Sequence, residues 1–196
     1  MDNINRREAL KRTAMVMGTA LSASTIAGIM QGCSAKPELD WTPDLFSEEQ
    51  ANLITYMAET IIPRTGTPGA RDVGVPQFIE DMVQDVYRED QREAFMTGMN
   101  AFMEVCEDKN GDPFYDLDEE ARLAYLKTYN EKMQSAPRGE APVDLRFFNQ
   151  VKELTVAGFF TSEAGATQVL QYKAIPVDYY GCISLEEAGG KTWATS

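Results

Sequence analysis

The chain has 196 residues, 43% of them hydrophobic, a length and composition that suit one domain with a packed core. With 31 acidic and 18 basic residues its formal net charge is −13, which argues against a nucleic-acid partner because duplex binding needs Lys and Arg to neutralise phosphates. No histidine is present, which excludes a Ser-His-Asp triad, a histidine-containing zinc site and a histidine-ligated haem.

The amino terminus resembles an export signal. Arg6 and Arg7 stand before an uncharged run from Thr13 to Gly32 that is rich in Ala, Gly, Ser and Thr. This run is too polar to predict a spanning helix, and a basic start followed by a short apolar stretch is typical of a secretory signal. The paired arginines resemble a twin-arginine signal, so residues 1–32 are predicted to direct the protein to the periplasm. The alternative is a Sec signal in which the arginines supply only positive charge.

The end of this signal resembles a lipobox, the site at which a bacterial lipoprotein is cleaved and acylated. Cys33 would become the first residue of the mature chain, and its acyl chains would hold the protein on a membrane without a spanning helix. The alternative is a soluble periplasmic protein in which Cys33 is incidental. Residues 33–45 contain two prolines and are predicted to be a tether. Residues 1–32 carry four basic and two acidic side chains, so their removal would take the net charge from −13 to −15.

Residues 46–196 are predicted to form one all-α domain. Ser47 and Gln50 have the spacing of a capping box, and the apolar residues that follow recur on one helical face as far as Pro63. Further helices are predicted from Pro76, over 90–107, from Asp118 and over 143–158. The side chains expected to face the core in the last two helices are Leu123, Leu126, Met133, Phe147, Phe148, Val151, Leu154 and Ala157.

From Phe159 onward the helical pattern ends. Residues 159–165 are predicted to be a turn that leads into a short helix ending at Leu170, followed by an irregular C-terminal arm. This part of the chain is rich in aromatic residues. Their side chains either fill a core or contact another protein, since Tyr and Trp are enriched at interfaces. The aromatic residues in this part are Phe159, Phe160, Tyr172, Tyr179, Tyr180 and Trp193.

No motif in the chain predicts catalysis or cofactor binding. Gly66 and Gly69 follow a helix and lack the Gly-x-Gly-x-x-Gly pattern, so no nucleotide site for FAD or NAD is expected in this chain. The glycine at 111 lacks the spacing of an EF-hand and predicts a turn. No catalytic, cofactor-binding or metal-ligating residue is therefore predicted. Cys106 and Cys182 could pair in an oxidising compartment or remain free, and the sequence favours neither.

Two stretches of the chain match a known pattern. The first runs from Leu53 through Ile61-Ile62-Pro63-Arg64-Thr65-Gly66-Thr67-Pro68-Gly69-Ala70 and continues with Gly74-Val75-Pro76-Gln77-Phe78-Ile79. The second runs from Leu154 to Gly165 and continues with Tyr172 and Tyr180-Gly181-Cys182. On these stretches the chain resembles the gluconate 2-dehydrogenase subunit 3 family, and the likeness runs in the same order from about Phe46 to Ile183, nearly the whole mature domain.

The resemblance implies the small, cofactor-free subunit of a periplasmic sugar or sugar-acid dehydrogenase. In such complexes a large flavoprotein of the glucose-methanol-choline type holds FAD and oxidises the substrate, often passing electrons to a cytochrome c subunit. The small subunit frequently supplies the twin-arginine signal and helps the large one to fold and travel. The candidate contacts with that partner are Pro63, Gly69, Phe159, Phe160, Tyr172, Tyr179 and Tyr180.

Two other functions compete with this one. The first is a stand-alone periplasmic lipoprotein that binds carbohydrate by stacking it on the aromatic arm. The second, which the sequence favours less, is a hydrolase that uses a pair of carboxylates.

Overall fold

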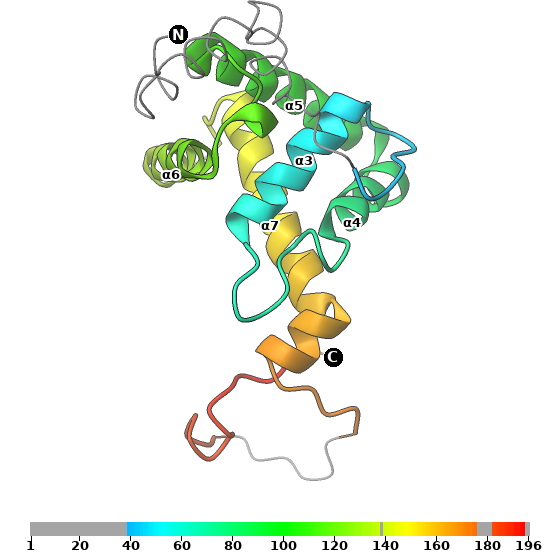
Figure 1. Ribbon diagram of the computed structural model, residues 1–196, viewed down its shortest axis with the longest axis vertical. Coiled ribbons are helices and arrows are strands. Elements are labelled where there is room, and N and C mark those ends of the chain that lie inside the picture. Colours follow the sequence, from blue (N-terminus) through cyan, green and yellow to red (C-terminus); the bar gives the residue numbers. More distant parts are fainter. Residues whose placement is uncertain (1–38, 138, 176–181, 195–196) are drawn as a thin grey trace, which may run out of the picture. The chain divides into compact units, whose positions relative to one another are not determined.

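The structure is a computed structural model that describes residues 39–137, 139–175 and 182–194 (Figure 1). Within these ranges the chain forms helices joined by loops, and one isolated parallel bridge joins Gln171 to Trp193. The prediction of an all-α domain is confirmed. The predicted export arginines Arg6 and Arg7, the predicted acylation site Cys33, and the candidate contacts Tyr179 and Tyr180 lie outside the described residues.

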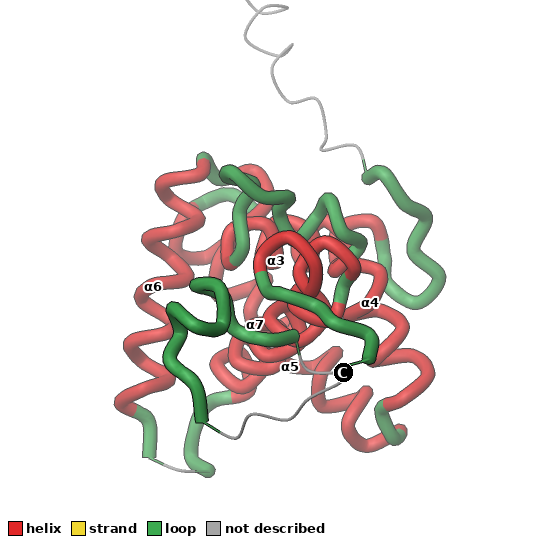
Figure 2. Tube along the Cα trace, turned by 90° about the horizontal axis from the view of Figure 1, so that it is seen from below, coloured by secondary structure: helices red, strands yellow, loops and turns green. Residues whose placement is uncertain are grey.

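The α-helices of the described ranges are α3, Glu48–Ile61; α4, Val75–Asp81; α5, Glu89–Asn110; α6, Glu119–Ser135; and α7, Val143–Thr161. The short elements are two π-helical turns, η1 at Met82–Val86 and η3 at Gly165–Val169, and a 3-10 turn, η2, at Phe114–Asp116. Helix α7 contacts α3, α4, α5 and α6, so it is the central helix of the domain (Figure 2).

The starts of α3, α4 and α6 and the end of α5 follow local signals in the sequence. The Ser47 hydroxyl accepts from the Gln50 N–H at 3.2 Å and the Gln50 side chain accepts from the Ser47 N–H at 3.0 Å, which completes the capping box of α3. Pro76 lies in the first turn of α4. Helix α5 ends at Gly111, whose φ of 81° is left-handed and favours glycine. Asp118 caps α6 by accepting from the Ala121 N–H at 2.8 Å.

Aromatic rings build much of the core. The centroid of the Phe102 ring lies 4.9 Å from that of Tyr129, 5.6 Å from that of Tyr125 and 5.6 Å from that of Phe147, so one side chain of α5 joins α6 and α7. Each such pair contributes about 0.5–1.5 kcal/mol beyond its burial. Helices α5 and α7 pack tightly at Gly98, where a Cβ would stand only 2.7 Å from a backbone carbonyl oxygen of α7.

The segment before α3 is fixed to α4 by a buried carboxylate. Glu80 is 4% exposed, and its carboxylate accepts from the N–H groups of Asp44 at 3.2 Å, Leu45 at 2.9 Å and Phe46 at 2.8 Å. The ring of Phe46 is thereby held against Phe95, with centroids 6.3 Å apart. Residues 44–46 are thus part of the folded domain.

The prediction that Leu123 and Ala157 face the core is wrong, since both are exposed. The buried face of α6 is set by Tyr125 and Tyr129, and Leu123 lies two positions before Tyr125. Two residues correspond to about 200° of rotation around a helix, so Leu123 points to the opposite side. Ala157 stands in the same relation to the buried Thr155 of α7.

Candidate subunit-docking surfaces

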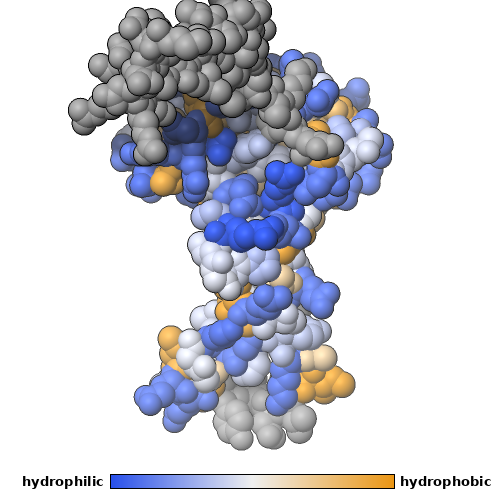
Figure 3. All heavy atoms as spheres, in the orientation of Figure 1, coloured by the Kyte–Doolittle hydropathy of each residue, from blue (hydrophilic) through white to orange (hydrophobic). Residues whose placement is uncertain are grey.

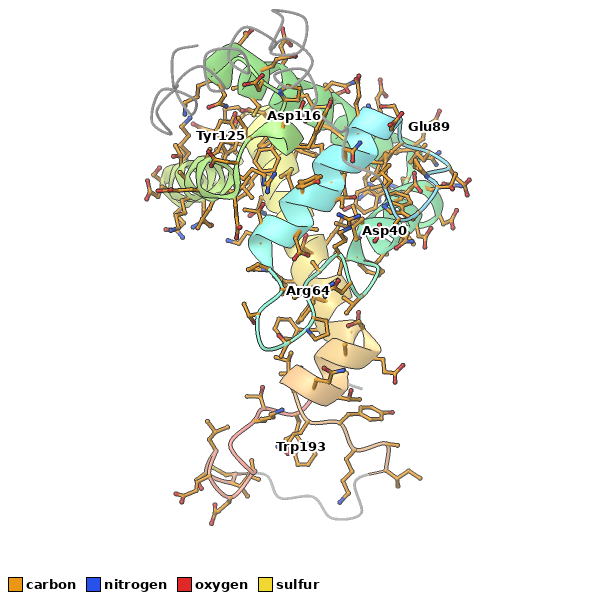
Figure 4. All side chains as sticks on the ribbon, in the orientation of Figure 1. Asp40, Arg64, Glu89, Asp116, Tyr125 and Trp193 are labelled. Carbon is orange, nitrogen blue, oxygen red and sulfur yellow. The ribbon has the colours of Figure 1, made fainter. Side chains whose placement is uncertain are left out.

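The loop between α3 and α4, residues 62–74, is held in shape by two carboxylates. Glu59 accepts from the backbone N–H of Arg64 at 2.9 Å and from that of Arg71 at 3.0 Å. Asp72 accepts from the Gly69 N–H at 2.9 Å and pairs with the Arg64 guanidinium. Figure 4 labels Arg64 on this loop. These internal bonds fix the loop without help from another molecule.

The two candidate residues of this loop occupy different environments. Gly69 is buried, and a Cβ there would stand 2.4 Å from one Glu59 carboxylate oxygen and 2.7 Å from the Arg64 backbone nitrogen. The position therefore requires glycine for a close approach inside the loop. Pro63 is exposed, as are the residues from Arg64 to Gly66. Of the pair, Pro63 is the residue that another protein can reach.

The loop does not suit the phosphates of a dinucleotide cofactor. A hollow of about 400 Å³ beside it is lined by Asp40, Glu59, Asp72 and two arginines. The carboxylates would repel a pyrophosphate, and each arginine pairs with a carboxylate, Arg64 with Asp72 and Arg71 with Asp40 at 3.2 Å. These residues do not fit FAD.

Phe159 and Phe160 lie in the last turn of α7, because the helix continues to Thr161 where a turn is predicted. Ser162 closes this helix: its hydroxyl donates to the Phe159 carbonyl at 2.7 Å and accepts from the Gly165 N–H at 3.1 Å. Phe159 is 2% exposed and belongs to the core. Phe160 is half-buried and meets Phe159 edge-on, with centroids 5.3 Å apart. Of the two rings, only Phe160 reaches the surface.

The C-terminal arm comprises the described residues of 171–194. It begins at Gln171, and its last described residues return to pair with the backbone of Gln171. The Gln171 N–H donates to the Thr192 carbonyl at 3.0 Å, and the Gln171 carbonyl accepts from the Ala194 N–H at 2.8 Å. The side-chain amide of Gln171 also donates to the carbonyls of Lys191, at 2.7 Å, and Ala188. We call this set of bonds the Gln171 clasp. It joins the two ends of a segment that sequence analysis predicts only as irregular.

The arm exposes large apolar side chains. Figure 3 shows apolar atoms on both sides of the arm, among polar ones, and Figure 4 places Trp193 on it. The aromatic residues of the arm stand out in the sequence, whereas its aliphatic residues do not, because no helical or strand spacing marks them. The exposed fractions are 54% for Tyr172, 78% for Ile175, 41% for Ile183, 57% for Leu185 and 50% for Trp193.

The two described cysteines are free thiols and do not pair with each other. Cys106 is buried in α5, whereas Cys182 is exposed on the arm. Burial raises the pKa of the Cys106 thiol above its ordinary value, which disfavours the reactive thiolate. The Asn110 side chain donates to the Cys106 carbonyl at 2.8 Å and lies 3.4 Å from its sulfur. Cys106 is therefore a packing residue.

Two tyrosine hydroxyls and a carboxylate form a hydrogen-bonded network in the core near Cys106. The Tyr129 hydroxyl donates to Asp144 at 2.9 Å, and the Tyr125 hydroxyl lies 3.4 Å from that of Tyr129. Burial raises the pKa of Tyr125 to about 12 and raises that of Tyr129 as well. Both phenols stay neutral at physiological pH, which suits a structural link between α6 and α7.

The described ranges contain neither a cluster of metal ligands nor a helix suited to span a membrane. No group of His, Cys, Asp or Glu side chains there is arranged to hold a metal ion. None of the helices in the same ranges combines the length and apolar character that crossing a bilayer requires.

Comparison with curated proteins and with solved structures gives no match. A family model does match, over residues 48–178, and its description is gluconate 2-dehydrogenase subunit 3. The matched range begins with the first residue of α3, includes the loop at 62–74 and every helix of the described domain, and ends within the arm. The chain therefore belongs to the gluconate 2-dehydrogenase subunit 3 family.

Proposed function

We propose that this chain is a non-catalytic accessory subunit of a periplasmic FAD-dependent sugar or sugar-acid dehydrogenase. The observation that carries the proposal is the family match over residues 48–178, because the family's description implies a component of a multi-subunit gluconate dehydrogenase. In this proposal the large subunit is a flavoprotein of the glucose-methanol-choline type. It holds FAD and oxidises the substrate, and a cytochrome c subunit receives the electrons.

The chemistry of the described side chains supports an accessory role. The carboxylates of the loop at 62–74 are engaged in holding the loop itself. The buried phenols and the buried thiol have raised pKa values, which oppose nucleophilic or general-base roles at neutral pH. These carboxylates, phenols and the thiol thus stabilise the fold, and the proposal assigns the redox step to the partner.

The proposal includes export and attachment to the membrane. Arg6 and Arg7 would be read by the twin-arginine machinery, which exports folded proteins, so one signal would carry this chain and its flavin-loaded partner together. Acyl chains on Cys33 would then hold the complex at the periplasmic membrane. The small subunit would also support maturation of the large one before export.

Capture of the partner tests the central part of the proposal. Tagged full-length protein, purified from the cells that produce it naturally, should co-purify with an equimolar larger chain that contains FAD, identified by mass spectrometry and flavin fluorescence. Isolation of this chain with no flavoprotein would refute the proposal.

The export step has a separate test. Changing Arg6 and Arg7 to lysines should leave both subunits in the cytoplasm, while a Sec-dependent periplasmic protein in the same cells is still exported. If the large subunit still reaches the periplasm, it does not depend on this signal. If this chain itself is still exported, the Sec alternative is favoured.

The exposed rings of Tyr172 and Trp193 favour a second candidate function, a stand-alone carbohydrate-binding lipoprotein, since half-exposed aromatic faces can stack on sugars. Calorimetric titration of the purified full-length chain with gluconate and with neutral sugars distinguishes the two functions. Binding by the chain alone would favour the second candidate, and its absence together with capture of a flavoprotein would favour the accessory subunit.

A further inference from the structure

We propose that the C-terminal arm is the element of this chain that docks on the large flavin-containing subunit, and that its apolar side chains form the centre of the contact. The inference rests on the proposed function, since it names the surface through which that function would be exerted. The side chains concerned are Tyr172, Ile175, Ile183, Leu185 and Trp193, all of which are exposed.

Exposed apolar side chains are concentrated on the arm. Ten large hydrophobic side chains of the described ranges are exposed, and five of them lie on the arm, although it supplies only the 18 described residues at 171–175 and 182–194. The other five are single residues spread over η1, α5, α6 and α7, as is normal on a soluble surface. The helical domain therefore offers no comparable concentration of apolar side chains.

The exposed apolar area is of the size that a protein interface needs. Tyr172 and Trp193 are each about half exposed, which leaves roughly 100 Å² apiece, because a buried aromatic side chain covers about 200 Å². The three aliphatic side chains add on the order of 200 Å². One side of a standard interface covers about 800 Å², of which about 60% is apolar. The arm alone approaches that apolar share.

The distribution of charge favours a protein as the occupant. Residues 39–170 contain 25 acidic and 11 basic side chains, a net charge of −14, whereas residues 171–196 contain three acidic and two basic ones, a net charge of −1. The cores of protein interfaces are depleted of charge in this way. A bilayer with anionic lipids would repel the neighbouring acidic domain.

The arm is also held ready for binding. The Gln171 clasp joins the two ends of the arm. Between these ends, Ser184 donates to the Glu187 carboxylate through its N–H at 2.9 Å and through its hydroxyl at 3.0 Å. Gly189 and Gly190 follow with left-handed φ values of 86° and 80°. A surface ordered in advance loses less conformational entropy on association, so more of the contact energy is available for affinity.

The test compares two matched triple variants of the full-length chain, produced together with the large subunit that the wild type captures. The arm variant carries Tyr172→Ser, Leu185→Ser and Trp193→Ser. The control variant carries Val105→Ser, Leu123→Ser and Val156→Ser, at positions that are 41%, 41% and 42% exposed on helices. The readouts are the FAD that co-elutes and the Kd of the complex. We expect the arm variant to bind at least about a hundredfold more weakly, and the control variant to bind within about threefold of the wild type.

Each outcome separates this inference from the proposed function. If the wild type captures no flavoprotein, the proposed function fails and the inference with it. If the wild type and the arm variant bind the flavoprotein equally, or if only the control variant loses binding, the arm is not the docking element and the proposed function stands. The inference is also overturned if the arm variant keeps the flavoprotein but loses binding to phosphatidylethanolamine–phosphatidylglycerol vesicles, or changes from dimer to monomer by light scattering.

A crosslinking measurement covers the case in which the arm variant does not fold. Leu185→p-benzoylphenylalanine places a photoreactive group on the arm with a single change. Irradiation of the assembled complex should join this position to the large subunit, whereas the same replacement at Val105 should give no such product. A crosslink from position 105 and none from position 185 would overturn the inference.

Discussion

Glu80 provides the sharpest test of how the amino-terminal end of the domain is held. Its buried carboxylate accepts three backbone N–H groups, two at Oε1 and one at Oε2. In Glu80→Gln the single carbonyl oxygen can still accept from Leu45 and Phe46, but the new NH₂ group would face the Asp44 N–H. One hydrogen bond to a charged acceptor is lost and two donors meet, so we expect the free energy of unfolding to fall by about 2 kcal/mol.

The larger change Glu80→Ala leaves all three N–H groups without their acceptor, and we expect a loss of about 3–5 kcal/mol. For a domain of this size 1 kcal/mol corresponds to about 2–4 °C in Tm. Urea denaturation followed by far-ultraviolet circular dichroism measures both variants. Asp81→Asn, at the exposed neighbouring position, is the control and should stay within about 0.5 kcal/mol of the wild type. A Glu80→Gln protein as stable as this control would refute the role assigned to the carboxylate.

Three further predictions concern other parts of the described structure. Gly158→Ala would place a Cβ 2.6 Å from a ring carbon of Phe78 and should destabilise the protein by about 1–3 kcal/mol in urea denaturation, whereas Gly66→Ala, with nothing within 4 Å, should not. Because the folded-state pKa of Tyr125 is raised from 10.0 to about 12, stability should be fully present below pH 10 and fall towards pH 12 by up to about 1.4 kcal/mol per pH unit. Tyr125→Phe should reduce that slope in urea denaturation at matched pH values, and an unchanged slope would contradict the assignment. Gln171→Ala should speed amide hydrogen exchange at Thr192 and Ala194 without affecting α5, and equal exchange in the arm would show that the side chain is dispensable for the clasp.

The helix starts could be predicted because their signals are local. Ser47 and Gln50 lie three residues apart, and Pro76 and Asp118 act within their own first turns. The end of α7 could not be predicted in this way. Gly158 resembles a helix terminator in the sequence, but the ring of Phe78 packs against it from α4, and that contact joins residues 80 positions apart.

The candidate site shows the same division between local and distant effects. An aromatic residue in an irregular segment carries no mark of its environment, so Phe159 and Tyr172 are equivalent in the sequence although the first is buried and the second exposed. In the sequence Glu80 cannot be distinguished from a solvent-exposed acidic residue of an amphipathic helix. Its carboxylate is buried because the backbone N–H groups of residues 44–46 donate to it. The Gln171 clasp likewise depends on carbonyls 17 to 21 positions further along the chain.

The Gln171 clasp has a consequence for how relatives of this chain could diverge. Because both ends of the arm meet at Gln171, the segment between them is a closed loop attached to the helical domain at one place. Under the docking proposed above, its sequence could be exchanged between homologues without altering the helical scaffold, and the recipient would then bind the partner of the donor.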